Sequence, residues 1–273
     1  MRRHRTPLRA SGLVVLLAVS LLPAGPALGQ RLSLDLRSME RERVLKAADL
    51  YVGYEPRTVT ASTSPRSPGG PHDYFSEGDY WWPDPKNPDG PYIRRDGMTN
   101  PSNFDDHRQA MRRLSLVVPA LAAAYTLTGE RKYAEAAAGH LRAWFVAEST
   151  RMAPHLKYSQ AVKGIATGRA PGVIDTIHLV EVARSVPLLE TAGALSGSEA
   201  AAVRRWFEEY LVWLTTSPLG TQEREAKNNH GTCWVMQAAA FAQLVGDTAR
   251  MSWCRERFKK VLLPNQMAAN GSF

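Results

Sequence analysis

The chain has 273 residues, 44% of them hydrophobic, and a formal net charge of +8 at pH 7. Residues 1–29 hold four arginines and no acidic residue, so the remaining 244 residues (273 − 29) carry a formal charge of +4 (8 − 4). This mild basic excess favours an anionic partner, but no basic run or nucleic-acid motif accompanies it, which argues against DNA and RNA. The length allows a sizeable core, in one large domain or an incomplete larger one.

The first 29 residues have the three parts of a secretory signal peptide. Arginines near the start are followed by an apolar run from Leu13 to Leu22 and by small residues at Ala27 and Gly29. The run has about 10 residues, against the ~20 that a bilayer-spanning helix needs, so an uncleaved anchor is the weaker alternative. We expect cleavage before Gln30, an exported protein in the periplasm or outside the cell, and no membrane association after cleavage.

Residues 30–273 are expected to form a single domain. Two cysteines, Cys233 and Cys254, lie 21 residues apart on consecutive predicted helices. Export permits a disulfide between them, and two buried thiols are the equal alternative. Neither cysteine stands in a metal-binding spacing, and no metal or cofactor is expected.

A long segment from residue 56 to residue 103, after a first predicted helix around Glu40 to Val52, is rich in proline and glycine. It also carries several aromatic residues, which flexible linkers seldom hold because such side chains need burial or a ligand to stack on. Loops of this length inside compact domains are usually functional. We therefore predict an ordered loop, whose aromatic residues are Tyr74, Phe75, Tyr80, Trp81, Trp82 and Tyr92.

From Asp105 onward the apolar residues recur at three- and four-residue spacing, which predicts helices. Three apolar runs finish in a glycine, the residue that takes the left-handed C-cap conformation most cheaply: Gly129, Gly197 and Gly246. An amphipathic helix follows each glycine, and its aromatic residues are expected in the core. Helical hairpins that stack in this way predict an all-α fold, an α/α toroid or incomplete α/α barrel.

The tetrad Asn228-Asn229-His230-Gly231 precedes an apolar helix predicted from Trp234 to Leu244. The simplest interpretation is a capping turn, because asparagine is a good N-cap. Two consecutive amides and a histidine exceed what a cap requires, and the positive end of a helix favours a bound anion. The tetrad is therefore a candidate catalytic site.

Four sets of motifs occur in the order in which they stand in one family. Each set is weak alone, but together they span most of residues 30–273, and the chain resembles the alginate lyase domain family. The motifs are Tyr80-Trp81-Trp82-Pro83-Asp84-Pro85 with Asp89-Gly90-Pro91-Tyr92, Arg95-Asp96-Gly97 and Asn100-Pro101; Gly164-Ile165-Ala166-Thr167-Gly168-Arg169; Gly172-Val173-Ile174-Asp175-Thr176; and Asn228-Asn229-His230-Gly231.

The resemblance implies an α/α toroid with a cleft for anionic uronan chains and β-elimination without a metal. Elimination requires neutralisation of the substrate carboxylate, removal of the C5 proton and protonation of the leaving glycosidic oxygen. By motif, Asn229 would neutralise the carboxylate and His230 would act as base or carboxylate partner. The implied partner is an acidic polysaccharide, alginate or another polyuronate.

Other residues of these motifs become candidates for substrate binding. Asn228, Gln160 and Arg169 would lie near the cleft; for Arg169 a structural ion pair or carbonyl-binding role is the alternative. Sugar faces could stack on three residues of the aromatic loop, with Arg95 beside them: Tyr80, Trp81 and Trp82. For at least one of the tryptophans, packing beneath the loop is the favoured alternative, because adjacent residues in an extended segment point to opposite faces.

In the alginate lyases the catalytic tyrosine and its accompanying arginine come well downstream of the Asn-His pair, whereas this sequence ends at Phe273. The resemblance therefore predicts an incomplete lyase that lacks its proton donor. Tyr158 or Tyr92 could substitute, although no spacing argument places either near His230.

Two other functions stay open. One is a non-catalytic protein that binds uronans without cutting them. The other is a glycoside hydrolase on the same scaffold, for which the clustered acids of the loop, Asp84, Asp89 and Asp96, would be the candidates.

Overall fold

Helices make up most of the computed structural model, which describes residues 35–272. The predicted signal peptide, residues 1–29, lies outside the described residues. The helices are α1 (Leu36–Tyr51), α2 (Asp106–Thr128), α3 (Arg131–Leu141), α4 (Val180–Thr191), α5 (Gly197–Thr216), α6 (Pro218–Arg224), α7 (Asn229–Val245), α8 (Thr248–Arg257) and α9 (Leu263–Gln266). Shorter helical segments are η1 (Val59–Ala61), η2 (Arg142–Val146), η3 (Ala170–Leu179) and η4 (Phe258–Leu262).

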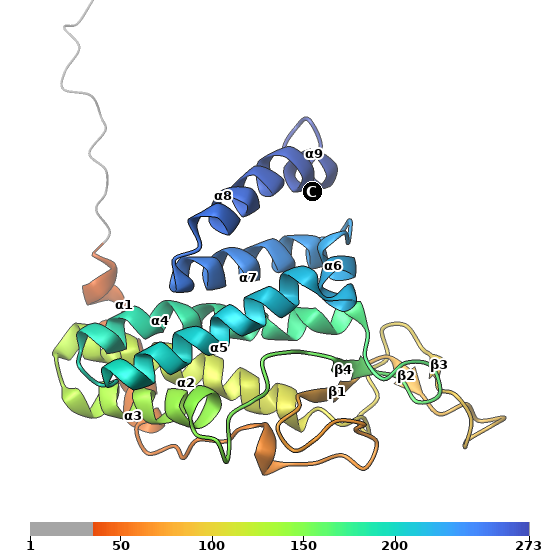
Figure 1. The fold of residues 1–273 in the computed structure, drawn as a ribbon, viewed down its shortest axis with the longest axis horizontal. Helices are drawn as coiled ribbons and strands as arrows, with labels where there is room; N and C mark the ends of the chain where they lie inside the picture. The colour runs from red at the N-terminus through yellow and green to blue at the C-terminus, as the bar shows by residue number, and fades with distance from the viewer. Residues whose placement is uncertain (1–34, 273) are drawn as a thin grey trace, which may run out of the picture. The chain divides into compact units, whose positions relative to one another are not determined.

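The long helices form consecutive hairpins. Helix α2 packs on α3, α7 packs on α8, and α4 packs on both α2 and α7. Helices α2, α4 and α7 thus form one row; α2, α7 and the segment η3 that leads into α4 all begin at the same end, on the right in Figure 1. Helices α3, α5 and α8 lead back from the far end. This arrangement is the α/α toroid that the sequence predicted, and the all-α class is confirmed.

Two of the three predicted glycine stops are correct. Gly129 and Gly246 cap α2 and α7 with left-handed φ angles of 73° and 78°. The prediction for Gly197 is wrong, because this residue is the first of α5. Ser196 caps that helix in a reciprocal capping box with Glu199, and the left-handed glycine after α4 is Gly193, with φ of 65°.

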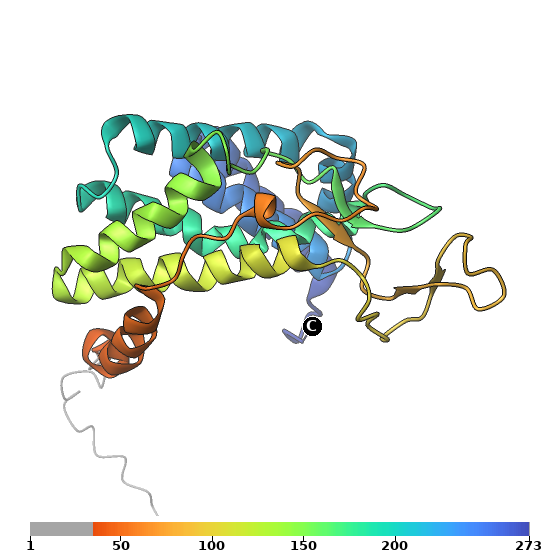
Figure 2. The ribbon, with the colours of Figure 1, turned by 90° about the horizontal axis from the view of Figure 1, so that it is seen from below.

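Four short strands lie outside the helical rows. Strand β1 (Phe75–Glu77) pairs in parallel with β4 (Tyr158–Ala161), and β2 (Trp81–Trp82) pairs antiparallel with β3 (Ile93–Arg94). Strands β2 and β3 belong to a loop that extends beyond the helix ends (Figure 2). The long aromatic segment is therefore hydrogen-bonded and ordered, as predicted.

Aromatic side chains fill the core between the rows. Phe145, Trp206, Phe207, Tyr210 and Phe241 contact one another, with ring centroids 4.7–5.7 Å apart. All five are buried. Their contacts join η2, α5 and α7 into one apolar cluster.

The expectation that the aromatic residues of the last hairpin are also core is wrong for two of them. Trp253 and Phe258 are each 43% exposed, because α8 packs on α7 through one face only. Trp253 rests edge-on against Trp234 and lies within 6 Å of the guanidinium groups of Arg224 and Arg257.

The two cysteines, Cys233 and Cys254, are free thiols rather than a disulfide. Burial raises the pKa of the Cys254 thiol to about 11. Between residues 35 and 272, no helix combines the length and the hydrophobicity needed to cross a bilayer.

Candidate active site

The tetrad occupies the first turn of α7 rather than the segment before it. Asn228 is the N-cap, and its side-chain oxygen accepts a hydrogen bond from the backbone N–H of His230 at 3.1 Å. The glycine at position 231 is a packing requirement, because a Cβ there would lie 2.2 Å from the carbonyl oxygen of Ala226. The start of α7 therefore sits directly against the turn that follows α6.

This close approach brings the His230 ring onto a buried acid at the end of α6. The Nδ1 atom of His230 lies 2.5 Å from Oε1 of Glu223, whose side chain is only 3% exposed. Burial raises the pKa of the Glu223 carboxyl; the hydrogen bond and charge of His230 oppose the rise, and the charge of Asp175 adds to it. A histidine and a carboxylate in this geometry form a hydrogen-bonded pair.

The other nitrogen of the imidazole is open. His230 Nε2 makes no hydrogen bond to any residue between 35 and 272, and it is not among the buried polar atoms that lack a partner. Asn229 is exposed beside it, and its side chain makes no hydrogen bond to the described part of the chain. An amide and an imidazole nitrogen are thus both free at the start of α7.

Helix α9 holds this helix start in place. Gln266 donates to the carbonyl oxygen of Asn228 at 2.8 Å and accepts from the hydroxyl of Thr232 at 2.7 Å. One amide side chain therefore bridges the N-cap and the first turn of α7.

Gln160 and Arg169 form a second group at strand β4. Gln160 has a φ of +47°, the only left-handed backbone angle of a non-glycine residue among those described. The strand is bulged there, because between the two paired positions β4 has two residues where β1 has one. Arg169 donates through Nε to the Gln160 carbonyl oxygen at 2.8 Å and through Nη2 to its side-chain oxygen at 3.2 Å.

Of the two structural alternatives for Arg169, the carbonyl-binding one is present, and no ion pair to Arg169 occurs within residues 35–272. Burial lowers the pKa of the Arg169 guanidinium, and the charge of Arg94 lowers it further. Such strained backbone held by a charged side chain is typical of functional sites.

The aromatic loop sends its two tryptophans in different directions. The Trp81 ring lies 5.4 Å from the guanidinium carbon of Arg169, so it belongs to the Gln160 group. Trp82 instead donates to the carbonyl oxygen of Met98 at 2.8 Å and stacks with Arg95 at 5.2 Å, inside its own loop. This is the divergence that adjacent residues of an extended strand produce.

Tyr80 is 40% exposed, and its carbonyl oxygen accepts from the backbone N–H of Arg95 at 2.8 Å. The Arg95 side chain stays with Trp82. Tyr80 and Arg95 are therefore held together by the β2–β3 pairing, next to Trp81.

A buried polar network connects the two groups through η3. Ser76 accepts from the Gln160 backbone N–H at 2.9 Å and donates to Asp175 at 3.1 Å. The next residue, Thr176, donates to Gln237 of α7 at 2.5 Å. Asp175 and Thr176 thereby link the Gln160 bulge to the helix that carries His230.

The candidate residues gather at one end of the helical rows. Segment η3 contacts β4, α6 and α7, and the strands and the start of α7 lie at the same end in both views (Figures 1 and 2). Asn228, Asn229 and His230 form one group there. Gln160, Arg169 and Trp81 form the other, with Tyr80, Trp82 and Arg95 in the adjoining loop.

Glu223 is the residue that the sequence did not reveal. It stands in no motif, and an acid seven positions before a histidine has no recognisable spacing. Only the turn between α6 and α7 brings the two side chains together. A run of small and polar residues at the end of a short helix gives no signal for a buried acid.

The alternative acid and tyrosine candidates lie elsewhere. Asp84 caps a turn in the aromatic loop, Asp96 pairs with Arg94 at 2.8 Å, and Asp89 is exposed. They provide no facing pair of carboxylates.

Neither tyrosine that was considered as a substitute proton donor contacts His230 in the described structure. Tyr158 lies against the ring of His155, with centroids 6.2 Å apart, and Tyr92 lies 5.8 Å from the ammonium of Lys163. Within residues 35–272, no group of three His, Cys, Asp or Glu side chains could hold a metal ion.

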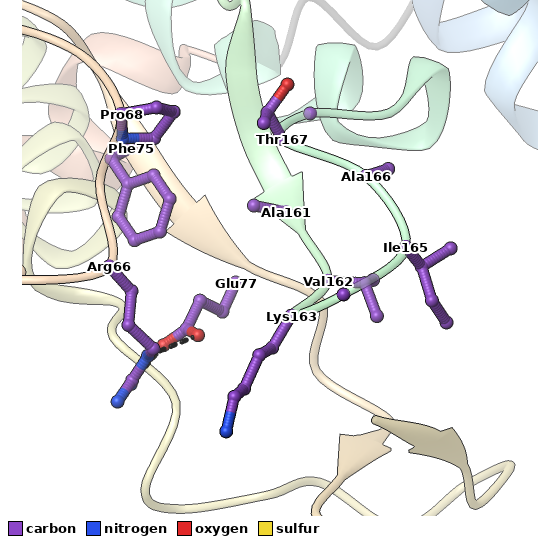
Figure 3. Close-up of a pocket in the computed structure, with 12 residues that line it drawn as sticks. Arg66, Pro68, Phe75, Glu77, Ala161, Val162, Lys163, Ile165, Ala166 and Thr167 are labelled. Atoms are coloured by element: carbon purple, nitrogen blue, oxygen red, sulfur yellow. Dashed lines mark hydrogen bonds and ion pairs between the residues drawn. The ribbon is translucent and has the colours of Figure 1, made fainter. Parts of the chain in front are cut away.

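A cavity of about 710 Å³ lies beside the Gln160 bulge. Figure 3 shows Phe75, Glu77 and Ala161 on its wall, together with Lys163 and the Arg66–Glu77 ion pair. Ser76 and Gln160, which alternate with these wall residues, take part instead in the Asp175 network. The cavity is thus adjacent to the candidate site and contains none of its residues.

Comparison with known proteins identifies the family. The family model described as alginate lyase matches residues 58–273. Among solved structures, the chain is similar to an alginate lyase from Bacteroides ovatus, with 33% sequence identity and a TM-score of 0.78. That match covers 85% of this chain and 64% of the other, so the chain spans less than two thirds of that lyase's length. A search of curated proteins finds no match. The family match, which extends over most of the chain, confirms the resemblance of the motifs: the chain belongs to the alginate lyase family.

Proposed function

We propose that the protein is a polysaccharide lyase that cleaves alginate or a related polyuronate by β-elimination, in the periplasm or outside the cell. The observation that carries this proposal is the pairing at the start of α7. There the free amide of Asn229 lies next to His230, whose Nδ1 is hydrogen-bonded to Glu223 and whose Nε2 is open. Family membership supports the reaction type.

The first requirement of the reaction is neutralisation of the uronate carboxylate. The Asn229 side chain can donate a hydrogen bond to that carboxylate and stabilise the enolate-like charge that forms when the C5 proton leaves. The α7 N-terminus adds a partial positive charge at the same place. Both contributions favour an anionic sugar over a neutral one.

The second requirement is a base. In the proposed reaction His230 Nε2 removes the C5 proton, and the electrons of the C5–H bond form the C4=C5 double bond. The bond between C4 and the glycosidic oxygen breaks, and that oxygen takes up a proton from water. The proton held on His230 Nε2 then returns to the solvent, which restores the neutral ring. The products are a new chain end and an unsaturated uronate.

The Gln160 group would bind the chain next to the reacting sugar. Arg169 uses Nε and Nη2 for Gln160, and its Nη1 makes no hydrogen bond to the described residues and is not buried without a partner. This leaves one guanidinium nitrogen for a second uronate carboxylate. Trp81 could stack on a sugar face beside it.

The proposal is tested by incubating the full-length protein with alginate, glucuronan and other uronans and following the absorbance of the unsaturated product. We expect absorbance to rise with at least one uronan. No rise with any uronan would contradict the proposal.

The alternatives give different outcomes in the same experiment. New reducing ends without the unsaturated absorbance would indicate a hydrolase. Uronan binding without turnover, in both the wild type and the His230→Ala variant, would indicate a non-catalytic binding protein.

A further inference from the structure

We propose that Glu223 is a positioning residue, which holds the neutral His230 ring in the tautomer that carries its proton on Nδ1. In this tautomer the lone pair of Nε2 is available for the substrate. The inference rests on the proposed function, because it assigns Nε2 of His230 as the base. It adds a residue that no motif of the sequence includes.

The distance between the two side chains indicates which nitrogen of His230 holds the proton. The Nδ1–Oε1 distance is 2.5 Å, in the range of strong charge-assisted hydrogen bonds. An ionised carboxylate can only accept hydrogen bonds. The proton between the two groups must therefore belong to Nδ1, which leaves Nε2 unprotonated in the neutral ring.

The difference in burial between Glu223 and His230 indicates which nitrogen of the ring faces the solvent. Its side chain is 3% exposed, while the His230 side chain is 25% exposed. The acid therefore lies behind the ring on the protein side, and the ring lies between the acid and solvent. Nε2, on the opposite edge of the imidazole, is the nitrogen that a substrate can reach.

A comparison with the other buried acids argues against a purely structural pair. Three carboxylates are buried in the described chain: Glu77, Asp175 and Glu223. Glu77 is paired with Arg66 and Asp175 with Arg108. Arginine stays charged and stabilises a buried carboxylate at any physiological pH. Of these three, Glu223 alone is paired with a histidine, whose neutral ring can carry its proton on either nitrogen.

The backbone enforces the pair. Ser217 caps α6 and orders the short helix that ends with Glu223 and Arg224. The close contact of Gly231 with Ala226 then fixes where α7 begins. The two side chains are thus brought together by main-chain contacts that do not depend on their own hydrogen bond.

The tautomer can be observed directly by nitrogen NMR. The experiment uses ¹⁵N-labelled full-length protein at about pH 8, where a neutral imidazole shows one protonated and one unprotonated nitrogen. The His230 signals are assigned by their disappearance in His230→Gln. The same spectrum is then recorded for Glu223→Gln, which keeps the size of the side chain but can donate as well as accept.

In the wild type we expect a protonated Nδ1 and an unprotonated Nε2. In Glu223→Gln we expect the Nε2–H tautomer to become populated. A wild-type ring with its proton on Nε2 would overturn the proposal, even if the variant did not fold. An unchanged tautomer in folded Glu223→Gln would also overturn it.

Enzyme kinetics provides a second test of the positioning role. We expect kcat of Glu223→Gln to fall about a hundredfold or more, as expected when a catalytic histidine loses its fixed tautomer, with KM close to the wild-type value. Glu190→Gln is the matched control, because Glu190 is a partly buried glutamate paired with Arg204 in a different part of the fold. Equal kcat values for Glu223→Gln and Glu190→Gln would contradict the positioning role.

The two proposals fail in different ways. If the wild type forms no unsaturated product from any uronan, the proposed function fails, while the NMR comparison still decides whether Glu223 fixes the ring. If the wild type is active and the tautomer does not depend on Glu223, the function stands and the positioning role is wrong.

Discussion

The Arg169 guanidinium binds both the main-chain carbonyl and the side-chain oxygen of Gln160, the one described non-glycine residue with a left-handed φ. Holding a residue in this conformation costs of the order of 1 kcal/mol or more, and the arginine contacts offset that cost. The same contacts place the guanidinium at the proposed uronate site. Arg169 therefore serves the fold and the substrate together.

Replacing Arg169 with lysine should affect both roles. Lysine keeps the charge, but it lacks the planar fork that binds two oxygens at once. We expect a loss of about 1.5–3 kcal/mol in unfolding free energy and a KM for uronan that rises about tenfold. Denaturant unfolding and initial-rate kinetics measure these changes. Arg95→Lys is the control, since Arg95 contacts Trp82 instead; equal effects at the two positions would count against the assignment.

Trp81 and Trp82 should contribute unequally to binding. Trp81 stacks on Arg169, whereas the Trp82 indole is hydrogen-bonded within its own loop. We expect Trp81→Ala to raise the Kd for a uronan oligomer about 3- to 30-fold, from the usual strength of cation–π and stacking contacts. Trp82→Ala should change it less. Titration calorimetry gives both values, and a larger effect at Trp82 would reverse the assignment.

Gly231 should be intolerant of any side chain. A Cβ at this position would lie 2.2 Å from the Ala226 carbonyl oxygen, so Gly231→Ala must displace the start of α7. We expect a loss of about 1–3 kcal/mol of stability, the usual cost of overpacking, together with a lower kcat.

Gly139 provides the matched control within α3. A Cβ there meets no atom within 4 Å, so Gly139→Ala should stabilise the protein by about 0.5–1 kcal/mol. Thermal melts of the two variants make the comparison. Similar melting temperatures for both would show that the Gly231 contact is not a constraint.

The protein should lose stability in mild acid. Burial lowers the pKa of His140 from 6.5 to about 4, with the charge of Arg113 acting in the same direction and a hydrogen bond to the backbone of Tyr54 opposing it. Below pH 6.5 the unfolded chain therefore binds a proton that the folded chain does not. The stability is complete above that pH and falls by up to about 1.4 kcal/mol per pH unit toward pH 4.

Burial also lowers the pKa values of His107, His155 and His178, so these histidines act in the same direction. Unfolding free energies measured between pH 8 and pH 4 test the slope. His140→Asn, which cannot titrate, should be less stable at pH 8 but should show a shallower slope. A variant with the wild-type slope would show that His140 does not contribute.

Local signals in the sequence were sufficient for most of the helical fold. The stops at Gly129 and Gly246 and the cap at Asn228 follow from backbone preferences of single residues, which act wherever the chain is placed. The error at Gly197 has the same local cause, because Ser196 and Glu199 form a capping box that makes this glycine a helix start.

The non-local parts of the site could not be predicted in this way. The pairing of β1 with β4 joins segments about 80 residues apart, and the bulge at Gln160 exists only through that pairing. The contact of Glu223 with His230 depends on the turn between two helices and on the close approach at Gly231. The family motifs gave the residues, but not their mutual arrangement.

The central claim is that His230 removes the C5 proton of a uronan, and the kinetics of His230→Gln on the best uronan substrate test it most directly. Glutamine retains a polar side chain of similar reach but cannot act as a base at neutral pH. The account predicts that kcat for unsaturated product falls about 10²- to 10⁴-fold while uronan binding changes little. A variant that keeps the wild-type kcat would contradict it.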